Sequence, residues 1–525
     1  MTGASGRHVV GLDVGTTGVK TVLLDETGRL AGRATVEYPL LRPRPGWAEQ
    51  DPERWYSAAA ESTRRALEDA GVSGERVAAV GLAGQMHGSV FLSEEGEPVR
   101  PAILWCDQRT GLECAEISRR VGGERRLVEM TSNRTQTGFT APKILWLRRN
   151  EPENWARTKK ILLPKDFVRY RMTNDFHTEV SDASGTLLFD VARRRWSDEV
   201  LRALEIPRDL LPAHVESPEI TRTLAQPAAK AMGLRAGTPV VGGAGDCAAG
   251  ALGTGVTRKG RLSVSIGTSG VLFAHADEPW TDPEGRLHTF CHAIPGAWHL
   301  MGVVLMAGGS LRWFRDEFAA EEREEANRRG VDPYEVICER AAKVAPGAEG
   351  LLFLPYLQGE RTPHADPEAR GAFTGLSLRH TRAHFARAVL EGVAFALRDS
   401  LEIFRSLGVA PREIRATGGG ARSAEWRRIL ADVLETPIAV PEVDEGPAFG
   451  AALLASVGAG TFFDVGEACE AAVRIRETTE PDSSRAALYA ERYSSYRALY
   501  PALKTRAETV PGTVSSGPPT ARNAD

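Results

Sequence analysis

Two short turns of this 525-residue chain share one pattern of glycine and hydroxyl residues, and each follows an apolar stretch. They are Gly15-Thr16-Thr17-Gly18-Val19 and Gly267-Thr268-Ser269-Gly270-Val271. Glycine permits positive φ and close approach of the backbone to a ligand, and successive N–H groups in a tight turn form a concave anion site. One such turn alone favours an ordinary hairpin. Two matched copies instead predict a pair of turns that holds a polyphosphate from both sides.

An acidic residue accompanies only the first of these turns. Asp13 stands two residues before Gly15, whereas Ser265 holds the equivalent place before Gly267. A carboxylate beside a phosphate turn suits Mg²⁺, which takes few protein ligands and keeps its waters. A turn-capping role explains the same residue equally well, so the sequence leaves both interpretations of Asp13 open.

A second carboxylate, Asp246, ends the glycine-rich run Gly242-Gly243-Ala244-Gly245 after a short apolar stretch over 239–241. The glycines leave space for a substrate, which makes Asp246 the candidate general base. The spacing alone favours an N-cap for a helix that would begin near Cys247. The two roles are compatible, because a cap uses only one carboxylate oxygen.

A third glycine-rich segment, Gly418-Gly419-Gly420-Ala421-Arg422-Ser423, lies between a predicted strand over 413–417 and a predicted helix. Three glycines admit a flat ring close to the backbone, and nucleotides often bind at strand-to-helix junctions. A plain flexible connection explains the segment equally well. The segment is neither GxGxxG nor GxxxxGK[ST], so a dinucleotide fingerprint and a P-loop are not indicated.

Two polar segments that follow apolar stretches are candidates for binding sugar hydroxyls. They are Gln85-Met86-His87-Gly88 and Trp105-Cys106-Asp107-Gln108-Arg109. Each is a weak signal alone, because single histidines and polar loop residues are common in structural roles. Three further histidines match no standard zinc spacing and are interpreted as packing or hydrogen-bonding residues: His288, His292 and His299.

The elements that must position these residues alternate between strands and helices, which is typical of α/β proteins. An antiparallel meander is predicted over 8–14, 19–24 and 30–36, and a helix over 52–70 begins at an Asp-Pro start signal. The opening strand and turn recur at 262–271. Duplication of a whole domain is the simplest account of this repeat.

The composition excludes several other classes of protein. The formal charge is -4 and the sequence pI is about 6.3, which gives no electrostatic footprint for nucleic acid or an anionic membrane. The six cysteines form no CxxC pair, so a disulfide framework or a zinc site is not expected. Neither a signal peptide nor an apolar stretch of roughly 20 residues is present, so a cytoplasmic setting is expected.

These segments resemble the FGGY family of carbohydrate kinases from about His8 to about Gly458, and within that family they are most similar to xylulokinases. Many segments occur in the family's order, which makes the resemblance specific. They are the Asp13 turn, Trp47-Ala48-Glu49-Gln50-Asp51-Pro52, Gln85-Met86-His87-Gly88, Arg100 to Trp105, Phe139-Thr140-Ala141-Pro142-Lys143, Leu163-Pro164-Lys165-Asp166, the Asp246 loop, Ser265 to Gly270, Phe353 to Leu357, Gly359-Glu360-Arg361-Thr362-Pro363-His364 and the Gly418 loop.

The resemblance implies an α/β fold with two duplicated actin-like (ribonuclease H-like) domains and an ATP/sugar cleft between them. It places a sugar-binding domain at 8–253 and a nucleotide-binding domain at 262–458. A C-terminal helical extension over 459–504 and a disordered tail over 505–525 are expected to follow.

The resemblance also implies residue roles. Asp246 would be the catalytic base, and Asp13 would hold Mg²⁺. The sugar would meet Gln85, Met86, His87, Trp105 and Asp107. ATP would meet Gly15, Thr16, Thr17, Gly267, Thr268, Ser269, Gly418, Gly419, Gly420 and Arg422.

The implied activity is phosphorylation of D-xylulose to D-xylulose 5-phosphate by ATP, with Mg²⁺ as cofactor. The expected partners are the sugar and ATP, with no nucleic acid and no membrane, and a homodimer is considered as the assembly. One alternative is a kinase for ribulose, glycerol or gluconate. Another is an actin-like ATPase that needs no sugar. Many xylulokinases have Asn at the position of Cys106, so fine sugar selectivity is left open.

Overall fold

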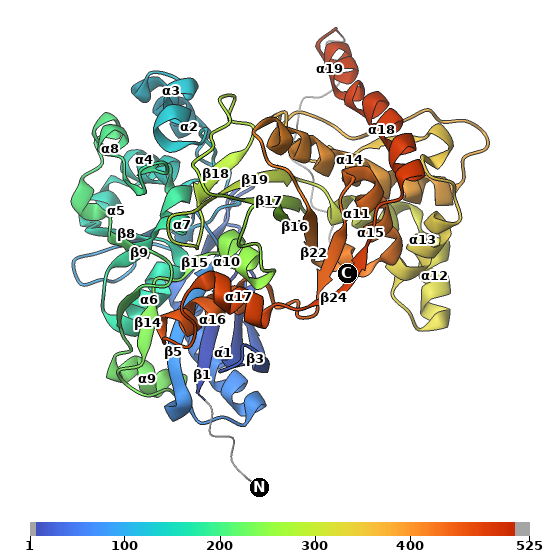
Figure 1. Cartoon of the computed structure of the whole chain (residues 1–525). Coiled ribbons are helices and arrows are strands. Elements are labelled where there is room, and N and C mark those ends of the chain that lie inside the picture. Colours follow the sequence, from blue (N-terminus) through green and yellow to red (C-terminus); the bar gives the residue numbers. More distant parts are fainter. Residues whose placement is uncertain (1–6, 510–525) are drawn as a thin grey trace.

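The computed structural model describes residues 7–509 and has two lobes, each built around a seven-stranded sheet (Figure 1). Six strands of the first sheet have the order β13-β14-β5-β1-β2-β3, and the seventh, β15, also pairs with β5. The second sheet has the order β18-β19-β17-β16-β22-β23-β24. The first-sheet strands are β1 (His8–Val14), β2 (Gly18–Asp25), β3 (Leu30–Glu37), β5 (Val77–Gly84), β13 (Ile220–Thr223), β14 (Pro239–Val241) and β15 (Ala244–Gly245). The second-sheet strands are β16 (Arg261–Ile266), β17 (Gly270–Ala276), β18 (His288–Cys291), β19 (Trp298–Val304), β22 (Glu413–Thr417), β23 (Ile438–Pro441) and β24 (Ile475–Thr479).

The two sheets repeat one topology. In each, the strand before the glycine turn pairs antiparallel with the strand after it, which are β1 with β2 and β16 with β17. The same first strand also pairs in parallel with a later one, β1 with β5 and β16 with β22. The predicted duplication and the α/β class with two actin-like lobes are therefore confirmed.

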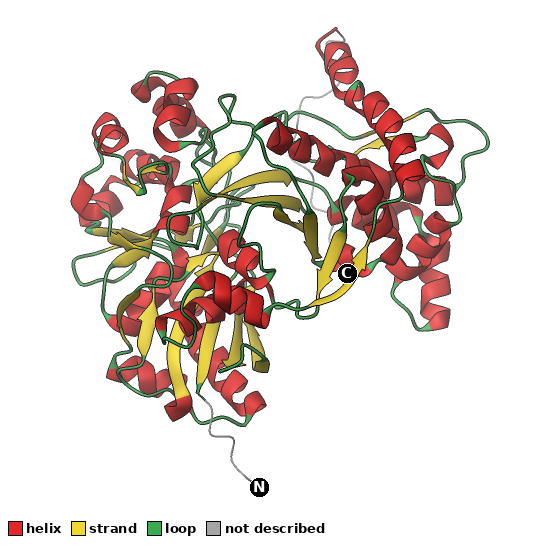
Figure 2. Ribbon diagram, in the orientation of Figure 1, coloured by secondary structure: helices red, strands yellow, loops and turns green. Residues whose placement is uncertain are grey.

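Helices cover both sheets (Figure 2). Helix α1 (Pro52–Ala70) has Asp51 as its N-cap and Gly71 in the left-handed conformation at its end, as its start signal predicts. The rest of the first half contributes α2 (Gly111–Val121), α3 (Glu124–Thr131), α4 (Thr140–Asn150), α5 (Pro152–Arg157), α6 (Pro164–Thr173), α7 (Val180–Ala183), α8 (Asp198–Leu204), α9 (Gln226–Met232) and α10 (Asp246–Gly253). The second lobe carries α11 (Gly308–Phe318), α12 (Ala320–Arg329), α13 (Pro333–Ala342), α14 (Arg382–Ser406) and α15 (Ala424–Leu434).

Helix α16 (Gly446–Gly458) lies on the sheet of the first lobe, although the sequence places it at the end of the second (Figure 1). It packs on β1, β5 and α10 in one apolar cluster. Glycines permit this approach: a Cβ at Gly81 would lie 2.1 Å from the Ala451 carbonyl oxygen, and one at Gly450 would lie 1.9 Å from that of Ala249. The two halves of the sequence are therefore interlocked through α16.

This contact gives a stability prediction. Gly81→Ala forces a methyl group into the backbone of α16, and overpacking of this kind costs about 1–3 kcal/mol or more. We expect a lower urea midpoint for unfolding. Gly111→Ala is the matched control, because a Cβ at Gly111 meets no atom within 4 Å. Equal midpoints for both variants would contradict the close packing.

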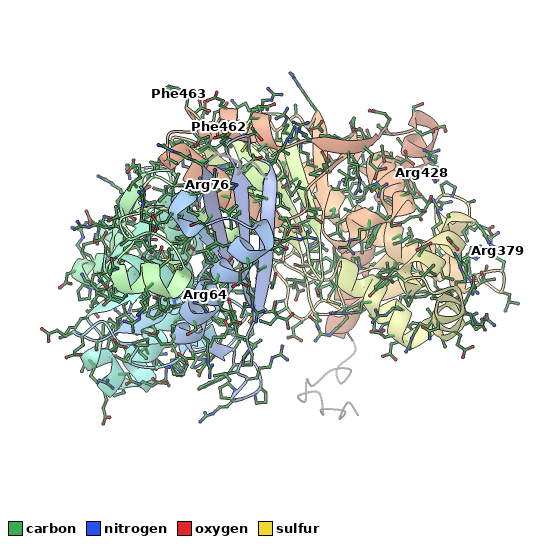
Figure 3. The ribbon with its side chains drawn as sticks, turned by 90° about the horizontal axis from the view of Figure 1, so that it is seen from below. Arg64, Arg76, Arg379, Arg428, Phe462 and Phe463 are labelled. Atoms are coloured by element: carbon green, nitrogen blue, oxygen red, sulfur yellow. The ribbon has the colours of Figure 1, made fainter. Side chains whose placement is uncertain are left out.

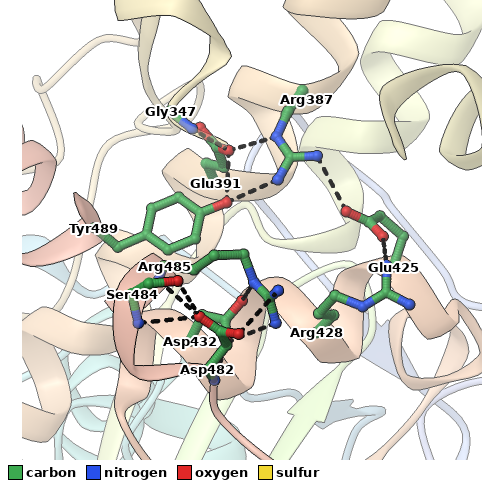
Figure 4. A network of polar contacts seen from close by, with 10 residues as sticks. All are labelled: Gly347, Arg387, Glu391, Glu425, Arg428, Asp432, Asp482, Ser484, Arg485 and Tyr489. Atoms are coloured by element: carbon green, nitrogen blue, oxygen red, sulfur yellow. Dashed lines mark hydrogen bonds and ion pairs between the residues drawn. The ribbon is translucent and has the colours of Figure 1, made fainter. Parts of the chain in front are cut away.

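The C-terminal segment contacts both lobes. It contains α17 (Val465–Ala472), strand β24, α18 (Ser483–Arg497) and α19 (Leu499–Thr509), so the expected helical extension also contributes a strand to the sheet. Helix α17 packs on α16 and α10 in the first lobe, whereas β24 and α18 join the second. Figure 4 shows Tyr489 of α18 against two side chains of α14: Arg387 donates to the Tyr489 hydroxyl at 2.9 Å, and that hydroxyl donates to Glu391 at 2.8 Å.

The tail expected over 505–525 overlaps the end of α19. Helix α19 continues through Thr509, because the helical pattern extends past Lys504 before the Pro, Gly and Ser residues begin. Residues 510–525 lie outside the part of the chain that the structure describes.

The surface carries one prominent aromatic side chain next to α16. Phe463 is 90% exposed, whereas the neighbouring Phe462 packs against the apolar cluster of α16 (Figure 3). Among residues 7–509, none of the helices combines the length and the apolar character that a bilayer crossing requires.

Candidate active site

Three neighbouring strand ends bring the candidate residues of the first lobe together. Strands β1 and β15 both run parallel to β5, and Asp13 and Ala244 both face Ala83 in the register. Parallel strands end at the same edge of a sheet, so the residues that follow them share one site. With about 4.8 Å between neighbouring strands, the Asp13 turn and Asp246 lie on either side of the Gln85 segment.

Thr16 connects the first glycine turn to three neighbouring side chains by hydrogen bonds. Its hydroxyl donates to Gln85 Oε1 at 3.2 Å and accepts from the indole N–H of Trp105 at 2.9 Å, while its carbonyl accepts from Gln50 at 2.7 Å. Gln85 is buried and also donates to the Gly15 carbonyl at 3.3 Å. Two residues assigned to the sugar by resemblance, Gln85 and Trp105, therefore also fix the shape of the predicted phosphate turn.

Asp246 is the first residue of α10, and Gly245 holds the N-cap position. The N-cap interpretation of Asp246 is therefore wrong by one residue. Its Oδ1 accepts from the Cys247 N–H at 2.7 Å, and the Cys247 side chain also interacts with the carboxylate. Burial raises the pKa of Asp246 to about 6, against the lowering effect of the Cys247 hydrogen bonds. A carboxyl group with a pKa raised toward neutrality suits a group that accepts a proton during a reaction.

Asp13 has an enclosed oxygen without a partner. Its Oδ1 is buried and accepts no hydrogen bond from the described residues. Burial and the charge of Asp246 raise the pKa of Asp13 to about 7, against the lowering effect of Lys20. A buried carboxylate oxygen without a partner, close to a second acidic group, fits a cation. Residues 7–509 contain no cluster of three or more metal-binding side chains.

Met86 and His87 line the space beside Asp246. A Cβ at Gly245 would lie 2.9 Å from Met86 Cγ, so Met86 lies against the backbone next to the candidate base. His87 Nδ1 is 2.7 Å from the Gly185 carbonyl, and burial lowers its pKa to about 3. The imidazole is therefore neutral with its proton on Nδ1, which leaves Nε2 as a hydrogen-bond acceptor.

Asp107 has internal partners. Arg109 donates to Oδ1 at 2.9 Å and to Oδ2 at 2.7 Å, and the Ala48 N–H donates to Oδ2 at 2.6 Å. The guanidinium of Arg109 also lies over the Trp47 ring, 3.5 Å from its centroid. With both oxygens occupied, Asp107 positions the loop that carries Trp105.

The second glycine turn and the Gly418 loop lie side by side in the second lobe. Strand β22 runs parallel to β16, and Ser265 faces Thr417, so Gly267 and Gly418 follow adjacent strand ends. Gly418 has φ 80°, and a Cβ there would lie 2.7 Å from the Ile266 carbonyl oxygen. Gly419 and Arg422 are exposed and Gly420 is buried.

The start of α11 is part of this arrangement, and the sequence reasoning missed it. The Thr268 carbonyl accepts from Ala307 N–H at 2.9 Å and from Gly309 N–H at 3.0 Å, and Gly308 donates to Gly267 at 2.9 Å. The pair Gly308-Gly309 after an apolar strand was the available signal.

A buried ion network behind the Asp246 loop was missed as well. Lys165 lies 2.7 Å from Asp166, 3.4 Å from Glu179 and 3.1 Å from Asp182, and all four side chains are at most 1% exposed. The network reaches the loop through Arg169, which donates to the Gly242 carbonyl at 2.9 Å.

Ser181, between two members of this network, accepts from the Gly245 N–H at 3.0 Å. The backbone on both sides of Gly243-Ala244 is thereby fixed, and with it the start of α10.

Comparisons with known proteins agree with this geometry. The N-terminal domain of the FGGY family of carbohydrate kinases matches residues 8–253, and its C-terminal domain matches residues 262–459. The xylulose kinase of Escherichia coli (strain K12) is 42% identical over 494 residues, which cover 94% of this chain and 98% of that protein. The gluconokinase of Bacillus subtilis (strain 168) is 34% identical over 86% of this chain and 88% of its own length.

A solved structure shows the same architecture. The crystal structure of xylulose kinase from Rhodospirillum rubrum superimposes with a TM-score of 0.88 at 31% identity, covering 96% of this chain and all of the other. Both lobes of the present chain are thus matched in sequence and in structure. The chain belongs to the FGGY family of carbohydrate kinases.

Proposed function

We propose that this enzyme transfers the γ-phosphoryl group of ATP to the 5-hydroxyl of D-xylulose, with Asp246 as general base. The observation that carries the proposal is the convergence of the Asp13 turn, the Gln85–His87 segment and Asp246 at the ends of β1, β5 and β15. The relatives named xylulose kinase support the choice of sugar. The first lobe, 8–253, would hold the sugar and the second, 262–458, the nucleotide.

The reaction forms one bond to the γ-phosphorus and breaks another. The 5-hydroxyl oxygen forms a bond to the γ-phosphorus, the bond from that phosphorus to the bridging oxygen of ADP breaks, and the hydroxyl proton passes to Oδ2 of Asp246. Because phosphoryl transfer needs little covalent help, the protein contributes mainly positioning and charge stabilisation. Met86 and the neutral His87 would orient the sugar next to Asp246.

The nucleotide phosphates would lie between the two glycine turns. Backbone N–H groups of Gly15 to Thr17 and of Gly267 to Ser269 would donate to phosphate oxygens, and the Gly418–Gly420 loop would pack against the adenosine. Asp13 would hold Mg²⁺, which when bound neutralises charge on the phosphates. Closure of the lobes would exclude water from the transfer.

A panel of sugars tests the substrate. Purified enzyme is incubated with ATP and D-xylulose, D-ribulose, gluconate or glycerol, and ADP is measured by a coupled assay. We expect the highest kcat/KM for D-xylulose. The gluconokinase relative makes gluconate the strongest competitor, and a higher kcat/KM for gluconate would replace D-xylulose as the substrate.

Asp13→Asn tests the metal role. The amide keeps the shape of the side chain but removes the charge that would hold the cation, so we expect a higher Mg²⁺ concentration for half-maximal activity, by about 10- to 100-fold. The measurement is a Mg²⁺ titration of the initial rate at saturating ATP and sugar. A titration curve like that of the wild type would contradict this assignment.

A further inference from the structure

An arginine of the second lobe makes no ion pair with any of the described residues. Arg361, in the loop after β20 (Leu352–Leu354), is half-buried, and its guanidinium forms no hydrogen bond or ion pair with residues 7–509. A guanidinium has five N–H donors and no acceptor, so its desolvation without a partner is costly. A bound ligand that presents oxygen acceptors would supply what the protein lacks.

The loop holds this residue firmly from both sides. The Leu305 N–H donates to Glu360 Oε1 at 3.0 Å, and the Thr362 N–H donates to the Val303 carbonyl at 3.1 Å. Val303 N–H in turn donates to Thr362 Oγ1 at 3.1 Å. The two neighbours of Arg361, Glu360 and Thr362, are therefore bonded to residues just after and just before Val304 at the end of β19.

This end of β19 packs against residues of the first lobe that lie next to the candidate base. Val303 and Leu305 pack in the same apolar cluster as Met86 and Cys247 of the first lobe. Cys247 follows the candidate base directly, and Met86 lies against Gly245. The loop of the second lobe thus meets the first lobe beside the residues proposed to hold the sugar.

The positive charge of Arg361 affects histidines on the sugar side of the candidate site. Burial lowers the pKa of His87 and of His288, and the positive charge of Arg361 lowers both further. The pKa of Asp13, by contrast, is set by burial, Asp246 and Lys20. Arg361 is therefore among the charges that act on the sugar-side histidine His87.

The C-terminal helices brace the loop. The Tyr500 hydroxyl of α19 donates to Asp366 at 2.5 Å, and Lys504 lies 3.3 Å from the same carboxylate. The His364 ring stacks on Tyr500 with 3.7 Å between centroids. A loop fixed at both ends of the segment 360–366 presents Arg361 with little freedom to turn away.

We propose that Arg361 is a sugar-binding residue of the second lobe, which donates hydrogen bonds to oxygen atoms of the bound ketose. The inference rests on the proposed function and adds a contact that forms across the cleft. It makes sugar binding dependent on both lobes, so that the sugar itself favours the arrangement in which ATP and Asp246 face each other.

The test compares Arg361→Met, Arg361→Lys and the control Arg370→Met, which removes an exposed arginine of the same loop. Steady-state kcat and KM are measured for D-xylulose and for ATP, together with the melting temperature. For Arg361→Met we expect the KM for D-xylulose to rise about 10- to 100-fold, the loss typical of a charge-assisted hydrogen bond, with the KM for ATP unchanged. Arg361→Lys should show a smaller rise, and Arg370→Met none.

The melting temperature distinguishes an effect of the substitution on sugar binding from an effect on folding. Removal of a desolvated cation without a partner should leave it unchanged or raise it. A wild-type KM for D-xylulose in Arg361→Met overturns the inference. In that case a fall in kcat would indicate a contact to the phosphoryl group, and a fall in the melting temperature alone would indicate a structural role. If the wild-type enzyme phosphorylates no sugar, the proposed function is wrong, and this inference, which depends on it, is wrong as well.

Discussion

Asp246→Asn should reduce kcat for phosphorylation of D-xylulose by about 10² to 10⁴, the usual effect of losing a general base. The amide retains the oxygen that accepts from the Cys247 N–H, so α10 should still begin at residue 246. What is lost is the acceptor for the hydroxyl proton. Nucleotide affinity, measured by titration calorimetry with an ATP analogue, should remain within about twofold of the wild-type value.

The pH profile gives an independent test of the same carboxylate. Burial raises the pKa of Asp246 to about 6, and only the deprotonated form can accept a proton. At saturating Mg²⁺, which would keep Asp13 ionised although its pKa in the free protein is about 7, the logarithm of kcat/KM should therefore fall with unit slope as the pH drops below about 6. The residual activity of Asp246→Asn should lack this acidic limb. An unchanged limb in the variant would assign the titration to another group.

Lys165→Met should destabilise the protein by about 3–5 kcal/mol, because it leaves buried carboxylates without their shared cation. Asp166, Glu179 and Asp182 all lie within 3.4 Å of Lys165, and burial raises the pKa of Asp182 well above its ordinary value. Denaturant unfolding measures the loss.

Lys259→Met is the matched control for this variant. Lys259 pairs with Asp277 at 2.9 Å, but both side chains are more than half exposed. Exposed pairs contribute little, so the change should stay within about 0.5 kcal/mol. Equal effects of the two substitutions would mean that the buried network does not support the Asp246 loop.

Local signals in the sequence predicted the local structure well. The bounds of β1 and α1 follow from a buried strand that ends at a glycine turn and from an Asp-Pro helix start, both of which act over a few residues. The repeat of a strand and a glycine turn was sufficient to predict the duplicated sheets. The expected N-cap at Asp246 was displaced by one residue, because the pairing of β15 extends the strand through Gly245.

Long-range packing could not be predicted from local signals of this kind. Helix α16 is rich in small residues, which predicts close packing but not the sheet of the other lobe as its partner. Likewise, Lys165 and Glu179 lie 14 positions apart, and nothing in their spacing indicates an ion pair. Arg361 was visible in the sequence as part of a motif, but its lack of a partner is a property of the folded chain alone.

The most direct test of the proposed activity is the product formed from ATP and D-xylulose, followed by phosphorus NMR as ADP accumulates. Phosphorylation at the 5-position predicts one equivalent of a sugar phosphate monoester for each ADP, with the phosphorus coupled to the two protons on carbon 5. ADP formation at the same rate without sugar, accompanied only by inorganic phosphate, would contradict a sugar kinase and favour an actin-like ATPase.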